Sequence, residues 1–354
     1  MTRAILTINL AHLLENYLSL KKIAGSAVAA AVVKDDAYGL GAKEVSQYLY
    51  EYGGCRDFFV AHASEGIEIR QLAKDTNIFV LQGITPDLAE DFTKFRLIPV
   101  VSTLEQIETC RHNVIPIPCV ANLETGLNRL GLREDDIKKI PEKERPDFLF
   151  VMSHLACADE EKHPLNKKQL QRLIELRGKY FPGAKLSLAA SDGVFLGADF
   201  RLDMVRLGAA IYGLNTTPYR ENQMKPVVYV KAPILQIADL PKGETAGYAA
   251  AFTARKNMKI AIVSIGYGDG FPRSLSNAGR VFINGEEARV LGRVSMDNLI
   301  VDVTGIEKVK EDDYAEILND EYTADDMGKD AGTIGYEIID RFGKAKRMER
   351  KYIF

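Results

Sequence analysis

A lysine stands at the end of a short apolar run near the start of the chain. Residues 31–42 read AVVKDDAYGLGA, so Lys34 follows the apolar residue Val33 directly and Tyr38 opens a tyrosine-glycine turn. A lysine at the mouth of a buried strand is a candidate nucleophilic amine, because burial lowers the pKa of an ammonium group. The same pattern also fits an ordinary solvated charge at a strand end.

Polar side chains that could do chemistry also lie at or near the ends of later apolar runs. They are Asn122, Arg129, His154, Ser191 and Arg206, the last followed closely by Gly208. Catalytic groups of a βα barrel come from the carboxyl ends of its strands, so these residues would converge with Lys34 on one mouth. Taken singly, a lone histidine after a strand is usually a hydrogen-bonded loop residue, and an arginine before a glycine commonly pairs with a surface carboxylate.

Short apolar runs alternate with helix-like segments over the first two thirds of the chain. The strand candidates are Ala27–Val33, Phe58–His62, Ile78–Leu81, Leu97–Val100, Ile117–Asn122, Phe148–Met152, Leu186–Ala190 and Val205–Leu207. Repeated βα units can close into an eight-stranded barrel or open into a doubly wound sheet, and the close spacing of these runs favours the (β/α)8 TIM barrel. A strand at Ala4–Asn9 and an amphipathic helix precede them.

The pattern changes near residue 225, where segments become long, alternating and rich in Val, Ile and Tyr. An Asn-Gly pair between Val281–Ile283 and Ala288–Leu291 is a hairpin signal. We therefore predict a barrel domain over residues 1–224 and a C-terminal, mainly β domain over residues 225–354. The charged run Lys344–Lys351 is interpreted as a solvated tail.

Length and composition exclude several classes of protein. The 354 residues suit two domains, and a net charge of -3 gives no electrostatic reason to expect nucleic acid or a membrane surface as a partner. The four cysteines form no CxxC pair, so neither a zinc site nor a disulfide framework is expected. The start of the chain does not resemble a signal peptide, and no long uncharged apolar run occurs. We expect a cytoplasmic protein without a metal that binds small molecules or other proteins.

The stretch AVVKDDAYGLGA closely resembles the AVVKANAYGHG motif of alanine racemases, pyridoxal-phosphate enzymes with an N-terminal βα barrel and a C-terminal β domain. Other segments resemble the family in the same order: TGLNRLG (Thr125–Gly131), SHLACADE (Ser153–Glu160), MVRLGAAIYG (Met204–Gly213), KPVVYVKAPILQI (Lys225–Ile237), ETAGYAAAF (Glu244–Phe252), IGYGDG (Ile265–Gly270), LGRVSMDN (Leu291–Asn298) and GTIGYEI (Gly332–Ile338). The resemblance spans nearly the full length. It separates this chain from single-domain pyridoxal-phosphate-binding barrels, which lack the β domain.

The resemblance implies roles for particular residues. Lys34 and Tyr248 would be the catalytic pair of acid/base groups. The cofactor-binding residues would be Lys34, Tyr38, His154, Ser191, Arg206, Gly208, Ala209 and Tyr336, and the substrate-binding residues Arg129, Tyr267, Met296 and Asp297. In the family the active site is shared across a head-to-tail homodimer, so Tyr248, Tyr267 and Met296 would reach Lys34 of the other subunit.

Four positions depart from the family's pattern. Asp36 stands where the family often has Asn, Leu40 where it often has His, and Ala190 replaces an Asn beside Ser191. Asp36 and Leu40 are expected to have small effects, and Ala190 to remove one hydrogen bond near the cofactor. Asn122 occupies the place of a lysine that is carbamylated in many members and braces the substrate-binding arginine. We expect Asn122 and a small anion such as chloride to replace that group beside Arg129; the alternative is an ordinary hydrogen-bonded amide.

The implied function is a pyridoxal-phosphate-dependent racemase that interconverts L- and D-alanine and supplies D-alanine for the cell wall. Racemisation needs an acid/base group on each face of the α carbon, and the pKa values of a lysine and a tyrosine must be lowered for either to act as a base at neutral pH. The alternatives are a broad-specificity or serine-preferring racemase, a pyridoxal-phosphate lyase on the same site, and a non-catalytic cofactor-binding protein.

Overall fold

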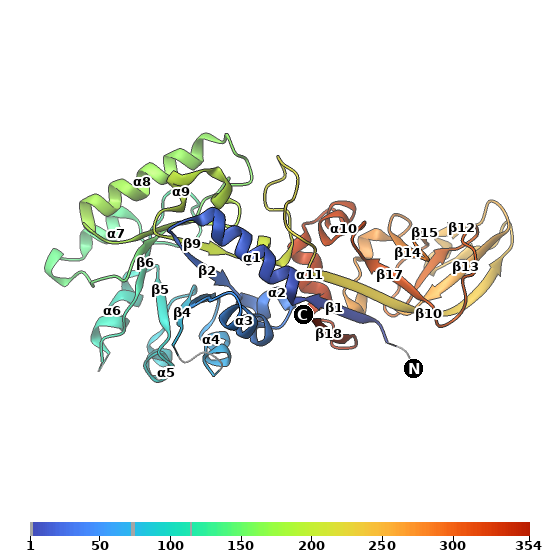
Figure 1. Cartoon of the computed structure of the whole chain (residues 1–354), viewed down its shortest axis with the longest axis horizontal. Coiled ribbons are helices and arrows are strands. Elements are labelled where there is room, and N and C mark those ends of the chain that lie inside the picture. The colour runs from blue at the N-terminus through green and yellow to red at the C-terminus, as the bar shows by residue number, and fades with distance from the viewer. Residues whose placement is uncertain (1–2, 72–74, 114) are drawn as a thin grey trace.

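The protein consists of two parts arranged along one long axis, with a barrel at one end and a β-rich domain at the other (Figure 1). The computed structural model describes residues 3–71, 75–113 and 115–354. Both the first strand and the last strand of the chain lie in the region where the two parts meet (Figure 1).

Eight parallel strands close into a barrel. They are β2 (Val28–Val32), β3 (Asp57–Val60), β4 (Asn77–Val80), β5 (Ile98–Val101), β6 (Val120–Asn122), β7 (Val151–Met152), β8 (Leu186–Ala190) and β9 (Met204–Leu207). The last strand, β9, pairs with the first, β2, from Val28–Met204 to Ala31–Leu207. Each strand overlaps one of the apolar runs, so the predicted (β/α)8 barrel is confirmed.

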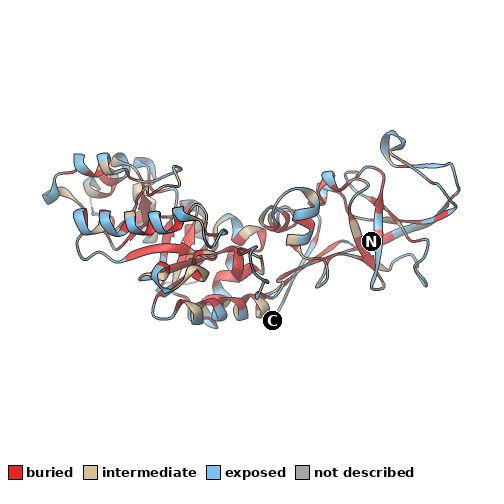
Figure 2. Cartoon of the chain, turned by 90° about the horizontal axis from the view of Figure 1, so that it is seen from above, coloured by how far each residue is buried: buried red, intermediate tan, exposed pale blue. Residues whose placement is uncertain are grey.

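Helices surround this barrel on the outside. They are α1 (Leu10–Ala24), α3 (Ala42–Glu51), α4 (Ala63–Arg70), α5 (Ala89–Phe95), α6 (Leu104–His112), α7 (Glu134–Lys139), α8 (Pro164–Tyr180) and α9 (Ala198–Arg201). The short α2 (Lys34–Gly39) instead lies at the mouth of the barrel, and residues 35–38 within it have left-handed φ angles. Buried residues follow the strands and the inner faces of these helices, whereas the outer faces are exposed (Figure 2). Within the described ranges, none of the helices has both the length and the apolar character that a membrane span requires.

Aromatic side chains fill the interior of the barrel. Along β3, Phe58 packs outward against the helices and Phe59 points into the barrel, as the alternation of a strand requires. Phe59 stacks on Phe79 with ring centroids 4.7 Å apart, and Phe150 meets Phe79 edge-on at 5.3 Å. The interior is therefore a packed core, and a cavity opens at its mouth.

The C-terminal domain is built on an eight-stranded sheet with the order β13-β16-β15-β14-β17-β10-β1-β18. Its strands are β1 (Ile5–Asn9), β10 (Val228–Leu240), β13 (Met258–Val263), β14 (Arg280–Ile283), β15 (Glu286–Leu291), β16 (Leu299–Asp302), β17 (Tyr314–Leu318) and β18 (Glu349–Ile353), with β11 (Thr245–Ala246) and β12 (Phe252–Thr253) in a small separate pair. Two helices, α10 (Ala324–Ala331) and α11 (Gly335–Gly343), complete it. The mainly β domain is thus confirmed.

The predicted hairpin lies where the Asn-Gly pair indicates it. Asn284 and Gly285 have φ angles of 53° and 80° between β14 and β15, and Ile283 pairs with Glu286. Two successive positive φ angles are the signature of the two-residue turn whose twist matches the flanking strands.

The chain crosses between the two parts more than once. The first strand, β1, pairs antiparallel with β10 and parallel with β18, so it belongs to the C-terminal sheet, and only then does the chain enter the barrel. The last barrel strand ends at Leu207 and β10 begins at Val228. The boundary between residues 224 and 225 stays a prediction.

The prediction that Lys344–Lys351 forms a solvated tail is wrong. Residues 349–353 form β18 in the sheet, and Lys344, Arg347 and Arg350 each lie within 3.5 Å of a carboxylate oxygen. A run of alternating charges looks solvated in the sequence because its partners are far away along the chain.

Candidate active site

A cavity of about 590 Å³ opens at the carboxyl ends of the barrel strands. Its lining includes most of the residues that the sequence predicts for the site: Lys34, Tyr38, Asn122, Arg129, His154, Ser191, Arg206, Gly208, Ala209 and Tyr336. Tyr336 comes from α11 of the C-terminal domain, whereas the others come from the barrel. The fold therefore brings these residues together around one volume.

Lys34 begins an unusual turn. Asp35, Asp36, Ala37 and Tyr38 have φ angles of 56°, 54°, 54° and 58°, so four successive residues other than glycine adopt the left-handed conformation. This conformation costs an L-residue roughly 1–2 kcal/mol, and it persists only where the surrounding structure enforces it. The turn places both Lys34 and Tyr38 on the wall of the cavity.

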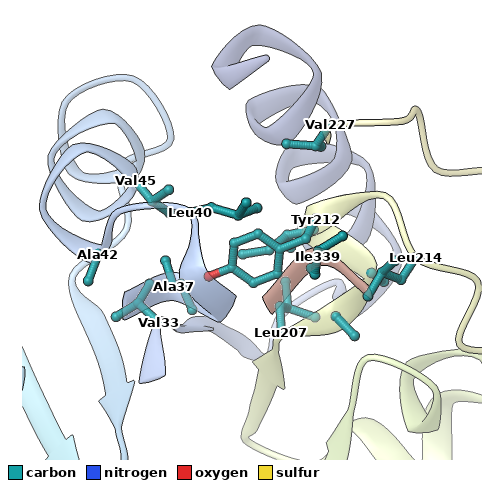
Figure 3. Close-up of a cluster of buried hydrophobic side chains, with 14 of the residues drawn as sticks. Val33, Ala37, Leu40, Ala42, Val45, Leu207, Tyr212, Leu214, Val227 and Ile339 are labelled. Carbon is teal, nitrogen blue, oxygen red and sulfur yellow. The ribbon is translucent and has the colours of Figure 1, made fainter. Parts of the chain in front are cut away.

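The core beneath this turn is centred on Tyr212, which no sequence signal singled out. Figure 3 shows Tyr212 among Val33, Ala37 and Leu40. The Tyr212 hydroxyl donates a hydrogen bond of 2.9 Å to the carbonyl oxygen of Val32, the last residue of β2. Leu40 is fully buried, so this departure from the family motif is an apolar contact in the core.

Burial lowers the pKa of the Lys34 ammonium group, and the positive charge of Arg129 lowers it further. Both effects favour the neutral amine, which is the nucleophilic form. The negative charges of Asp35 and Glu65 act in the opposite direction. Lys34 is thus the amine of the cavity best prepared to attack a carbonyl group.

Ser191 and the backbone after β9 form an arrangement suited to an anion. The Ser191 hydroxyl accepts hydrogen bonds from the backbone N–H groups of Gly208 at 2.9 Å and Ala210 at 3.3 Å. A Cβ atom at Gly208 would lie 2.7 Å from the hydroxyl oxygen of Tyr38, so a larger residue here would force Tyr38 to move. Converging N–H groups and hydroxyls are what a phosphate group needs.

Arg206 is a buried cation held by neutral acceptors. It is 4% exposed and donates to the Ser187 hydroxyl at 2.6 Å and to the carbonyl oxygens of Ser153 at 2.7 Å and Leu188 at 3.1 Å. Burial lowers the pKa of Arg206 to about 10, which leaves the group charged at neutral pH.

His154 is neutral at physiological pH. Its Nδ1 atom lies 3.3 Å from a guanidinium nitrogen of Arg206, and because a guanidinium only donates, Nδ1 accepts and the ring proton sits on Nε2. Burial, followed by the charges of Arg206, Arg129 and Lys34, lowers the pKa of His154 to about 3. The ring therefore presents an uncharged face to the cavity.

Asn122 holds the loop that carries Arg129. Its side-chain nitrogen donates to the Ser102 hydroxyl at 3.1 Å and to the Leu130 carbonyl oxygen at 2.8 Å. Arg129 itself is exposed on the cavity wall. The amide thus has the ordinary hydrogen-bonded role that was the alternative for Asn122, and the positive charge at this side of the cavity comes from Arg129.

The other predicted residues lie away from this cavity. Tyr248, Tyr267, Met296 and Asp297 are in the C-terminal domain and do not contribute to the lining. Tyr248 is 71% exposed and Met296 is 52% exposed. The backbone N–H of Tyr267 donates to the Ser295 carbonyl oxygen at 3.0 Å, so the Tyr267 and Met296 loops lie side by side.

Arg347 joins these two loops and was missed by the sequence reasoning, which placed it in a solvated tail. Its guanidinium group donates to Asp269 at 2.9 Å, to Asp297 at 2.5 Å and to the carbonyl oxygen of Met296 at 3.4 Å. Asp269 in turn accepts from the backbone N–H of Gly266, just before Tyr267. No local pattern could have identified this residue, because its partners are 50 to 78 positions away.

Two family models match the chain, "Alanine racemase, N-terminal domain" over residues 8–216 and "Alanine racemase, C-terminal domain" over residues 227–352. Alanine racemase of Rhizobium meliloti (strain 1021) is 39% identical over 368 residues, covering 98% of this chain and 96% of that protein. Alanine racemase of Rickettsia canadensis (strain McKiel) is also 39% identical, covering 99% of each chain.

Solved structures agree with these matches. The chain superposes on alanine racemase from Bartonella henselae with covalently bound pyridoxal phosphate with a TM-score of 0.94, at 34% identity and full coverage of both chains. Biosynthetic alanine racemase from Pseudomonas aeruginosa gives a TM-score of 0.91 at 30% identity, again with full coverage. Since both halves of the chain and the whole fold match, this protein belongs to the alanine racemase family.

Proposed function

We propose that this protein is a pyridoxal-phosphate-dependent alanine racemase that interconverts L- and D-alanine. The observation that carries the proposal is the position of the Lys34 amine, whose pKa is lowered, in the same cavity as the Ser191 hydroxyl with its backbone N–H donors and the buried cation Arg206. The similarity to alanine racemases over nearly the whole chain supports the same function.

The residues of the cavity fit pyridoxal phosphate. When bound, this cofactor supplies an electron sink for the bond that is broken at the substrate's α carbon. Lys34 would hold the cofactor covalently, and Tyr38, Ser191, Gly208, Ala209 and Tyr336 would hold its phosphate group.

Arg206 and His154 would determine the electrostatic environment of the cofactor ring. A guanidinium group stays charged and only donates, so Arg206 facing the pyridine nitrogen would disfavour a proton there. The neutral His154 ring would pack beside it without adding charge. We propose that this pairing suppresses side reactions that need a protonated ring.

The proposed second acid/base group, Tyr248, is exposed and lies off the cavity of its own chain. We therefore propose a head-to-tail homodimer in which Tyr248, Tyr267, Met296 and Asp297 complete the Lys34 cavity of the other subunit. Two observations support this arrangement: large side chains are exposed together in the C-terminal domain, and the cavity opens to solvent.

Mixing two inactive variants tests the shared site. In a mixed dimer of Lys34→Ala and Tyr248→Phe, one site would have both defects and the other neither. Random assembly makes half of the dimers mixed, so activity should return to about a quarter of the wild-type value. If the mixture remains as inactive as its components, the two residues belong to one chain's site and the head-to-tail arrangement is wrong.

A chiral assay in deuterated water tests the function itself. The purified protein with pyridoxal phosphate should show the visible absorbance of a lysine-bound cofactor and should exchange the α proton of either alanine enantiomer. Exchange with many amino acids would indicate a broad-specificity racemase, and formation of pyruvate and ammonia from serine, by loss of its β hydroxyl as water, would indicate a lyase. Binding of the cofactor without any exchange would reject the enzyme proposal.

We also propose that a small anion such as chloride lies near Asn122 and Arg129. Arg129 is exposed on the cavity wall, and Asn122 supplies no negative charge where the family often has a carbamylated lysine. Because both protons of the Asn122 amide are used on Ser102 and Leu130, Arg129 would provide the attraction. Crystals grown in bromide should show anomalous scattering beside Arg129; water alone would reject the anion. A cytoplasmic location and a role in cell-wall supply stay predictions.

A further inference from the structure

The left-handed turn that follows Lys34 touches the C-terminal domain of its own chain. Gly39, at the end of α2, packs against Gly343, at the end of α11: a Cβ atom at Gly39 would lie 3.0 Å from the Gly343 Cα. A Cβ atom at Gly343 would collide with the carbonyl oxygen of Gly39. Two backbones 304 positions apart can meet here only because neither residue carries a side chain.

Lys344 links the turn to α11. Its ammonium group lies 2.9 Å from a carboxylate oxygen of Asp35 in the turn and 2.9 Å from one of Asp340 in the helix. Burial raises the pKa of the Asp340 carboxyl group, and the nearby negative charge of Asp35 raises it too, so the two carboxylates are close enough to repel. Lys344 is the cation that allows them to face each other.

Arg350, in β18, holds the other end of the turn. Its guanidinium group donates to the carbonyl oxygens of Gly39 at 2.9 Å and Gly343 at 2.6 Å, and lies 3.5 Å from the Asp36 carboxylate. The hydroxyl of Tyr352 adds a hydrogen bond of 3.1 Å to the carbonyl oxygen of Leu40. Both residues bind backbone atoms of the segment that carries Lys34 and Tyr38.

These contacts affect the backbone geometry of the turn more than the free energy of unfolding of the whole protein. Ion pairs as exposed as Lys344–Asp35 contribute little to the free energy of unfolding. The turn, however, holds four residues in a conformation that they disfavour, so it would relax wherever its surroundings allowed. Relaxation would move Lys34 and Tyr38, which the proposed function requires at opposite ends of one cofactor.

We propose that Lys344 and Arg350 are positioning residues that hold the turn after Lys34 in the geometry that pyridoxal phosphate requires. The acidic pair Asp35–Asp36 is the matching half of this contact, which gives the departure at Asp36 a structural role. The proposal rests on the function proposed above, and its first test does not need the cofactor.

Hydrogen exchange of the full-length protein without cofactor measures the turn directly. The backbone N–H groups of Ala37, Leu40 and Gly41 donate within it, to Val33, Ala37 and Asp36 respectively. In Arg350→Met we expect these amides to exchange about tenfold faster, while the β14–β15 hairpin keeps its rate. Lys351→Met, next to Arg350 in the same strand, is the matched control and should leave the turn unchanged.

Titration with pyridoxal phosphate gives the second readout. The dissociation constant should rise about tenfold in Arg350→Met and about threefold in Lys344→Met, with Lys346→Met, an exposed lysine two positions away, as control. Arg350→Lys keeps the positive charge but loses the guanidinium group that binds two carbonyl oxygens at once. Its dissociation constant should therefore lie between those of the wild type and Arg350→Met. If Arg350→Met fails to fold, Arg350→Lys replaces it as the test variant.

A rescue separates positioning from a general structural role. Adding Asp35→Ala to Lys344→Met removes the repulsion between Asp35 and Asp340, so the double variant should bind the cofactor more tightly than Lys344→Met alone. Additive weakening, or a turn whose exchange does not respond to Arg350→Met, would overturn the proposal. A different result would separate the two proposals. If hydrogen exchange of the turn becomes faster in Arg350→Met but even the wild type binds no cofactor covalently, the proposed function is wrong, whereas the role of Arg350 in holding the turn is supported.

Discussion

The mouth of the barrel and the exposed part of the C-terminal domain that carries Tyr248 and Met296, which we call the exposed face, contain residues of one proposed reaction, yet they are opposite in character. At the mouth, Arg206 is buried, His154 is half-buried, and both are hydrogen-bonded within a single chain. On the other face, Tyr248 and Met296 project into solvent. The difference accords with the proposed head-to-tail dimer, in which one chain assembles the cofactor half of the site and a second copy supplies the substrate half.

The largest effect on activity should come from a substitution of Lys34 at the mouth of the barrel. Lys34→Ala removes the residue that we propose as both the cofactor's covalent partner and one acid/base group, so racemisation should fall by at least about 10³-fold and the visible absorbance of the bound cofactor should vanish. The thermal melting of the protein should barely change, because the lysine is partly exposed. A variant that keeps a tenth of the wild-type rate would show that Lys34 is not the amine in question.

A substitution of Tyr248 on the exposed face should reduce activity less, and it should affect the two alanine enantiomers unequally. Tyr248→Phe leaves the mouth intact, so the absorbance should stay, while α-proton exchange from one alanine enantiomer should slow by about 10²-fold more than from the other. Exchange rates in deuterated water, measured separately for L- and D-alanine, provide the check. Equal losses for both enantiomers would contradict the assignment of one base to each face of the substrate.

The barrel and the contents of its mouth were predictable because they depend on local patterns. Apolar runs mark the strands, and the polar residue after each strand must face the same end of a barrel, as His154 after β7 does. The hairpin at Asn284–Gly285 follows from the backbone freedom of two residues. In each case the signal that predicts the structure lies in neighbouring residues of the sequence.

The contacts that hold the site together were not predictable in this way. Asp35–Tyr38 contains no glycine, so no residue preference indicates a left-handed turn, and only tertiary packing explains it. Lys344 finds Asp35 across 309 positions, and in the sequence it is one charge in a charged run. Local patterns treat such charges as solvated, because solvation is the usual outcome when no partner is near.

Arg347 offers a smaller test of the exposed face. Arg347→Met removes the cation between Asp269 and Asp297, so the loops of Tyr267 and Met296 should separate and turnover should fall about tenfold. The cofactor absorbance should persist, because the mouth is untouched, and Lys346→Met is the neighbouring control. A loss of cofactor binding in Arg347→Met would mean that the two regions are less independent than their structures indicate.

The smallest effect concerns the desolvation of His154 at the mouth and is measured through the pH dependence of stability. The pKa of His154 is about 3 in the folded protein, and an unfolded histidine has a pKa near 6.5. Below about pH 6.5 the unfolded chain therefore binds a proton that the folded chain refuses, and the wild type loses stability as the pH falls. His154→Asn carries no such group, so its stability deficit relative to the wild type should shrink by about 0.8 kcal/mol between pH 8 and pH 6. Urea unfolding of both proteins gives the difference in their free energies of unfolding at each pH. The carboxylates are the same in both proteins, so their titration cancels in each difference. Parallel curves would mean that His154 titrates in the folded protein as it does in water, and the contrast between a desolvated His154 at the mouth and the exposed face would then disappear.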